Sequence, residues 1–266
     1  MIRRPPRSTQ GVSSAASDVY KRQAIVADDV SLIVGVGTSV RKNLVQAGYT
    51  TLGSIAQSDE NQLVNVNGVG PTSAKKMVVS AQAIQSQKPL RRGELDEIRK
   101  GKTDVFFDFE GAQEQGGSET SSQVNYLIGA VYRSNGSEGE YRPFFADRFD
   151  LEGENLSEFL DWAVSLEDPV FYHWHHYERT HLAKMAKRWG QDPKKVLFVL
   201  DRLEDLSPWA TNGYAFPAYG EGLKAIAKSL GIGWQHDDVS GVGSIALYEK
   251  FVNSGGTDQA LSLIHI

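Results

Sequence analysis

Thr103–Gly111, TDVFFDFEG, sets two acidic residues into an apolar run near the middle of the chain. Side chains alternate along a β-strand, so residues two positions apart share a face. A strand here places Asp108 and Glu110 on one face and Phe107 and Phe109 on the other. Two carboxylates close together in a partly buried position repel each other unless a cation or a proton lies between them. The pattern indicates a metal site, with two solvated acids at a strand end as the alternative.

The segments that follow predict an α/β domain. Two further strands are expected over Val124–Tyr132 and Tyr141–Ala146, and the short Asn-Gly-containing turn between them predicts antiparallel pairing. Apolar residues at helical spacing predict a helix over Leu156–Val164, and a fourth strand is expected over Val170–His173. Strand, hairpin, helix and strand in this order resemble an RNase H-like fold, in which helices flank a mixed sheet.

Three histidines stand within four positions at the end of the fourth predicted strand, in the sequence HWHH at residues 173–176. His173, His175 and His176 suggest zinc, but their order matches no zinc motif. Alternatively, Glu178 opens a helix and points toward the strand that carries the first two acids. A third carboxylate there completes most of a magnesium or manganese site, because these hard cations prefer oxygen ligands.

Residues 24–90 are predicted to form a small all-α domain with two similar hairpins. Each hairpin has Gly-Val-Gly between two predicted helices, at Gly35–Gly37 and at Gly68–Gly70. Glycine lets the backbone approach a phosphate closely, and the free N–H groups at the start of the next helix can bind phosphate oxygens. Basic residues lie one turn further along, at Arg41, Lys42, Lys75 and Lys76.

This pair of hairpins resembles the tandem helix-hairpin-helix module, which holds nucleic acid by its backbone. The resemblance implies ionic contacts that weaken as salt rises. DNA is favoured over RNA as the partner. In the alternative interpretation the glycines only terminate helices and the basic residues are solvated. The residues expected to bind nucleic acid are Gly35, Gly37, Arg41, Lys42, Gly68, Gly70, Lys75 and Lys76.

A closer resemblance rests on five segments: FFDFEG, FYHWHHYERTHL, RLEDLSPW, GYAFPAYGEGLKAIAKSLGIGW and GVGSIALYEKF. Together they resemble the RNase H-like exonuclease domain of RecB-family nucleases, in the DEDD exonuclease superfamily. The first family motif, Asp-x-Glu, matches Asp108 and Glu110. In the second motif, Glu178 stands where the family usually has Asp. The resemblance thus implies that Asp108, Glu110 and Glu178 are catalytic metal ligands.

The implied activity is 3' to 5' exonuclease hydrolysis of phosphodiester bonds, with two Mg²⁺ or Mn²⁺ ions about 3.5–4 Å apart. DNA repair and a helicase partner that supplies single strands fit this resemblance. The family's fourth acid lies in a late helical motif that is not found before the chain ends, so the chain as given is expected to be weak or inactive. The rival hypothesis is a nucleic-acid-binding module whose RNase H-like domain is only a scaffold.

The two ends resemble translated sequencing-adaptor read-through, at residues 1–23 and 261–266. The first stretch is expected to be disordered, because it lacks hydrophobic periodicity. Between them we expect the hairpin domain at 24–90, a polar linker with one short helix at 91–103, and a C-terminally truncated RNase H-like domain at 104–260.

Composition limits the class of protein. A length of 266 residues with 40% hydrophobic residues suits one or two globular domains. Cysteine is absent, which excludes disulfides and thiolate metal sites. No apolar stretch is long enough to span a bilayer, so a cytoplasmic setting without membrane contact is expected. The net charge of -5 conceals a mildly basic region before residue 104 and an acidic region after it.

Overall fold

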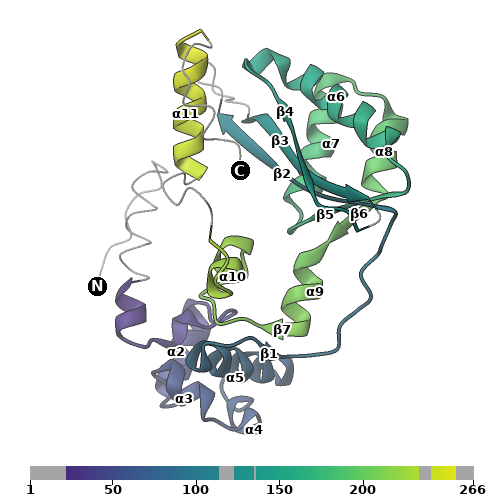
Figure 1. Ribbon diagram of the computed structural model, residues 1–266. Coiled ribbons are helices and arrows are strands. Elements are labelled where there is room, and N and C mark those ends of the chain that lie inside the picture. The colour runs from purple at the N-terminus through teal and green to yellow at the C-terminus, as the bar shows by residue number, and fades with distance from the viewer. Residues whose placement is uncertain (1–21, 114–122, 135, 234–240, 256–266) are drawn as a thin grey trace. The chain divides into compact units, whose positions relative to one another are not determined.

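The structure is a computed structural model. It describes residues 22–113, 123–134, 136–233 and 241–255 (Figure 1). Two compact units are present. The first, the helical unit, holds the chain up to Glu94 together with Thr211–Ile232. The second, the sheet unit, holds Leu95–Ala210 together with the residues from Gly233 onward.

The helical unit begins with two helical hairpins that share one apolar core. Buried side chains from every helix, including Leu44, Ile55, Leu63 and Ala74, form this core. Burial of apolar surface in this core stabilises helices that are too short to persist alone in water. The elements of the hairpins are η1 (Val30–Leu32), α2 (Thr38–Gln46), α3 (Leu52–Ala56), α4 (Glu60–Leu63) and α5 (Pro71–Ser86).

The two glycine turns have the same backbone conformation. Gly35 and Gly68 have φ angles of 86° and 85°, a left-handed region that favours glycine. Gly37 and Gly70 then precede α2 and α5 in extended conformation. The repeat seen in the sequence is therefore also a repeat of backbone geometry.

A later part of the chain completes the helical unit. Strand β7 (Tyr214–Ala215) pairs antiparallel with β1 (Leu90–Arg91), and α10 (Leu223–Ser229) follows in the same unit. The buried Arg92 guanidinium donates to the Thr211 carbonyl at 2.6 Å and to Ser80 Oγ at 2.7 Å. These bonds attach the segment 211–232 to α5.

A mixed five-stranded sheet forms the centre of the sheet unit. Its spatial order is β4-β3-β2-β5-β6. The pairs β2–β3 and β3–β4 are antiparallel, whereas β2–β5 and β5–β6 are parallel. The strands are β2 (Thr103–Gln113), β3 (Gln123–Ser134), β4 (Glu140–Phe145), β5 (Pro169–His173) and β6 (Leu203–Asp205).

Helices cover one face of this sheet. Buried side chains of α6 (Glu152–Ser165), α7 (Tyr177–Trp189) and α8 (Pro193–Leu200) pack against Val105, Phe107 and other residues of the strands (Figure 1). The alternation in β2 thus turns its apolar residues toward these helices and its acids away from them. This arrangement confirms the predicted RNase H-like α/β class with a preceding all-α region.

A smaller apolar cluster holds the last described helix, α11 (Gly241–Asn253), on the sheet. The ring of Tyr248 stacks on that of Tyr126 of β3, with 4.0 Å between ring centroids. The Tyr248 hydroxyl donates to the Ala146 carbonyl at 2.9 Å. The remaining elements are η2 (Phe149–Leu151) and α9 (Leu206–Gly213).

The structure differs from two expectations about the chain that follows the hairpins. The linker at 91–103 holds no helix; it starts from β1 and continues without regular structure to β2. The segment 211–232, expected within the RNase H-like domain, belongs to the helical unit. The second difference arises because the β1–β7 pairing joins residues that are distant in sequence. No helix in the described ranges is both long and apolar enough to cross a membrane.

Candidate acidic site and nucleic-acid interface

The three predicted acids lie on two elements of the sheet unit. Asp108 is on β2, opposite Gly129 of β3, and Glu110 is the last residue before the register of that pair shifts. Glu178 is in the first turn of α7, directly after β5. Since β5 runs parallel beside β2, its end delivers the start of α7 to the acids of β2.

The turn between β5 and α7 is fixed by a polar network. His175 adopts a positive φ of 66°, which is uncommon for a residue with a side chain. Its backbone N–H donates to Asp205 Oδ1 at 2.9 Å, and its Nδ1 lies 3.0 Å from Ser207 Oγ. Asp205 also accepts from the backbone N–H of Ser207 at the start of α9. The network therefore sets where α7, and with it Glu178, begins.

The electrostatics of Asp108 show that the acids are close together. Solvent still reaches this side chain, but the protein atoms around it reduce its solvation. Burial, followed by the charges of Glu178 and Glu110, raises the pKa of Asp108 to about 7. The backbone N–H of Phe109, 2.8 Å from Asp108 Oδ1, opposes this rise. Near neutral pH, Asp108 can thus hold a proton where a cation could lie instead.

Glu178 is itself buried beside His173. His173 Nδ1 and Glu178 Oε2 lie 3.3 Å apart, but they lack the alignment of a hydrogen bond, and neither atom has another partner among the described residues. A buried carboxylate oxygen without a partner is costly. Glu178 therefore has one oxygen available for a proton or a cation.

The hydroxyl of Tyr177 also belongs to the site. Its ring packs on the sheet core, while Gln123 Nε2 donates to the hydroxyl at 2.7 Å. Burial raises the pKa of Tyr177, and the charges of Asp108, Glu110 and Glu178 add to the rise. The position of Tyr177 at the first residue of α7, directly before Glu178, is the sequence signal that could have indicated this role.

The donor chemistry of the acids fits a hard cation, since Asp108 and Glu178 offer the carboxylate oxygens that such cations prefer. However, in the ranges that the structure describes, no three or more His, Asp or Glu side chains are grouped so as to hold a metal ion. The same finding applies to the histidines of the zinc alternative. Of its histidines, His173 lies beside Glu178, His175 beside Ser207, and His176 just before α7.

The hairpins present the features expected of a backbone-binding surface. The N-cap residues Gly37 and Gly70 have no side chain with which to cap the first N–H groups of α2 and α5. Lys42, Lys75 and Lys76 are exposed. Arg41 differs from them, because Asp29 pairs with its guanidinium and has its own pKa well below the ordinary value as a result. The three lysines therefore carry the more available charge.

Comparison with known families defines the class of protein. A family model described as the SAM-like helix-hairpin-helix tandem matches residues 28–83. A second family model, described as the RNase H superfamily, matches residues 105–265, more than half of the chain. The protein thus joins a helix-hairpin-helix tandem to an RNase H-like domain. The chain belongs to the RNase H superfamily.

Neither the curated proteins nor the solved structures gave a significant match. The two families support a nuclease-like or nucleic-acid-related function.

Proposed function

We propose that this protein is a metal-dependent 3' to 5' exonuclease that hydrolyses phosphodiester bonds in DNA. The observation that supports it best is the raised pKa of Asp108, caused by burial and then by Glu178 and Glu110, in a domain of the RNase H superfamily. Acids crowded in this way are typical of sites that hold cations or protons for catalysis. The assignment to RecB-family nucleases, the role in DNA repair, the helicase partner and the cytoplasmic setting are parts of the same proposal.

Each acid has a role in this proposal. Asp108, Glu110 and Glu178 would hold Mg²⁺ or Mn²⁺, and a bound ion would supply activation of a water molecule and stabilisation of the leaving oxygen. His173 packs beside Glu178 and restricts its carboxyl group. The Tyr177 hydroxyl, held by Gln123, is placed to orient a polar group at the edge of the site.

In the same proposal the hairpins bind the nucleic acid. Gly35, Gly37, Gly68 and Gly70 bring the backbone N–H groups of two helix starts to phosphate oxygens. Arg41, Lys42, Lys75 and Lys76 add charge attraction that does not depend on base sequence.

A second candidate function is a nucleic-acid-binding module without catalysis. It is favoured by the finding that the described residues hold no group of three ligands for a metal ion. In this alternative the sheet unit is a scaffold, and binding survives the loss of Asp108 and Glu178.

Degradation of end-labelled single strands of DNA and RNA, with Mg²⁺, Mn²⁺ or EDTA, separates the two candidates. We expect metal-dependent shortening of DNA from the 3' end by the unchanged protein. Asp108→Asn and Glu178→Gln should each reduce it by about 100-fold or more, which is the scale for losing a residue of the catalytic centre. The matched control is Asp104→Asn, because Asp104 also lies on β2 but pairs with Arg133. Salt-sensitive binding without metal-dependent degradation would instead establish the binding module.

A further inference from the structure

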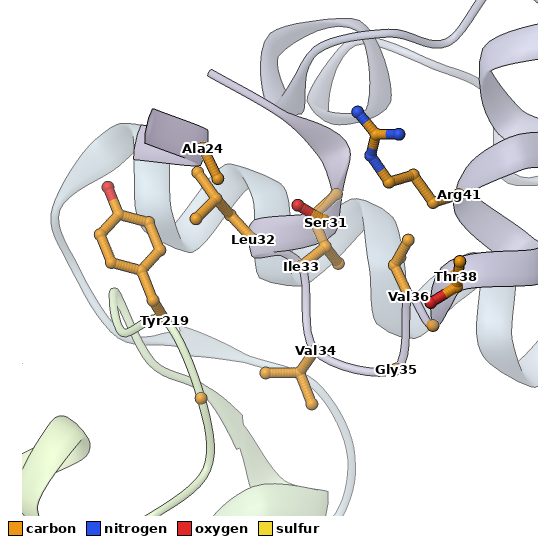
Figure 2. A pocket seen from close by; sticks show the side chains of 12 residues that line it. Ala24, Ser31, Leu32, Ile33, Val34, Gly35, Val36, Thr38, Arg41 and Tyr219 are labelled. Atoms are coloured by element: carbon orange, nitrogen blue, oxygen red, sulfur yellow. The ribbon is translucent and has the colours of Figure 1, made fainter. Parts of the chain in front are cut away.

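The first hairpin borders an open cavity of ≈ 820 Å³, a volume within the range of about 300–1,000 Å³ that is usual for small-ligand sites. Figure 2 shows Tyr219 on one side of this cavity and the start of α2 on the other. Among the residues that line it are Leu32, Val34, Val36, Thr38, Arg41 and Tyr219.

Tyr219 comes from the segment 211–232, and the structure fixes it in place. Its ring packs against the apolar core of the hairpins. Upstream, β7 pairs with β1, and downstream, Glu221 pairs with the buried Arg92 at 3.2 Å. Tyr219 is thus held on both sides along the chain, which makes its ring a fixed wall of the cavity.

The lining has two chemical parts. Leu32, Val34 and Val36 together with the Tyr219 ring offer an apolar surface. Gly35, Gly37 and Thr38 offer the glycine turn and the start of α2, which is the proposed phosphate-binding part of the hairpin. A ligand that fills both parts has an anionic group joined to a flat or apolar group.

A nucleotide of a nucleic-acid strand has this combination. Its phosphate suits the helix start, and its sugar and base suit the apolar wall, where an aromatic ring can stack on a base. In a duplex the base is already stacked and paired, so it cannot enter a side cavity without being extruded. The cavity is therefore suited to an unpaired nucleotide.

We propose that Tyr219 and the first hairpin form a binding site for one unpaired nucleotide next to the hairpin-bound phosphate. This site rests on the proposed nucleic-acid binding by the hairpins and specifies their substrate as a strand with a single-stranded end. In this proposal the binding surface has two parts that are distant in sequence: the first hairpin, and Tyr219 from a segment more than a hundred residues further along the chain.

The test is equilibrium binding of the full chain, in EDTA to prevent hydrolysis, to a DNA duplex with a 3' overhang and to the blunt duplex of the same sequence. Tyr219→Ala and Tyr219→Leu should weaken overhang binding by roughly 5-fold or more, the scale of one lost stacking contact, and leave blunt binding unchanged. Tyr219→Phe should keep the affinity. Leucine retains the apolar packing, so it separates stacking from folding of the unit.

The matched control is Tyr49→Ala, since Tyr49 packs on the same core but does not line the cavity. The proposal is overturned if Tyr219→Leu, like Tyr49→Ala, binds both duplexes with the affinity of the unchanged protein, while the double change Lys75→Gln, Lys76→Gln weakens binding to both duplexes. That result leaves the nucleic-acid function of the hairpins intact. If the unchanged protein binds neither duplex, or if the lysine changes have no effect, the proposed hairpin function fails and this site fails with it.

Discussion

Glu178 of α7 raises the pKa of Asp108 more than Glu110 does, although Glu110 lies only two residues from Asp108 on the same strand. Burial contributes most, and the charge of Glu178 comes next. The acidic site is therefore a tertiary feature that depends on where α7 begins. The turn that carries His175 is therefore needed to position Glu178 near Asp108.

The first prediction concerns stability and pH. The folded-state pKa of Asp108 is about 7, above the ordinary value of 3.8, so the folded protein binds this proton more tightly than the unfolded chain does. The stabilisation is fully present below the unfolded pKa and is lost as pH rises through about 7. We expect the free energy of unfolding of the metal-free protein to fall over this interval. Urea unfolding in EDTA across the interval measures this fall.

Asp108→Asn cannot ionise and should remove this fall. The variant should match the unchanged protein in acid and exceed its stability above neutral pH. Asp104→Asn, on the same strand, should keep the fall. An equal pH dependence in Asp108→Asn and the unchanged protein would show that Asp108 is not the titrating group.

The second prediction concerns Glu152, which is fully buried at the start of α6. It accepts from Arg188 Nη1 at 2.8 Å, from Trp189 Nε1 at 2.7 Å and from the backbone N–H of Asn125 at 2.6 Å. Because Glu152→Ala leaves these donors unsatisfied, we expect a loss of about 3–5 kcal/mol in the free energy of unfolding. Denaturant titration measures it, with exposed Glu154→Ala of the same helix as the control; equal effects of the two changes would be inconsistent with this structure.

The third prediction concerns the attachment of α11. Tyr248→Ala removes the ring that stacks on Tyr126 and should cost about 3–5 kcal/mol. Tyr248→Phe keeps the ring and loses only the hydrogen bond to Ala146, so it should cost about 1 kcal/mol. Thermal unfolding of both variants measures the difference, and a Phe variant as unstable as the Ala variant would show that stacking is not the main contribution.

The fourth prediction concerns salt. If Lys75 and Lys76 each neutralise one phosphate, Lys75→Gln and Lys76→Gln should each lower the slope of log affinity against log salt by about 1. Fluorescence anisotropy with labelled DNA over a range of salt measures the slope. Lys187→Gln in the sheet unit is the control. An unchanged slope in both lysine variants would exclude them from the phosphate contacts.

Much of the fold could be predicted because its signals are local. Alternation in TDVFFDFEG predicted a strand with both acids on one face, and β2 extends over Thr103–Gln113. The Asn-Gly turn predicted the antiparallel pair that β3 and β4 form. The two Gly-Val-Gly turns predicted the hairpins, whose left-handed glycines follow directly from the residue type.

Other features depend on contacts between distant residues and could not be predicted locally. Nothing near Tyr219 or Leu90 indicates that β7 returns to pair with β1. Glu152 looks like an ordinary acid in a first helical turn, but in the fold it is buried and accepts hydrogen bonds from the distant residues Asn125, Arg188 and Trp189. The hydroxyl of Tyr177 lies at the site because it accepts a hydrogen bond from Gln123 of β3, a residue distant in sequence.

The measurement that tests the central claim most directly is a manganese titration followed by thermal unfolding. It compares the unchanged chain with the double variant Asp108→Asn, Glu110→Gln. A ligand that binds only the folded state raises the unfolding midpoint in proportion to its occupancy, so activity is not required. We predict that Mn²⁺ raises the midpoint of the unchanged chain and leaves that of the double variant where it was. Equal responses of the two proteins, or no response in either, would contradict a metal site at these acids.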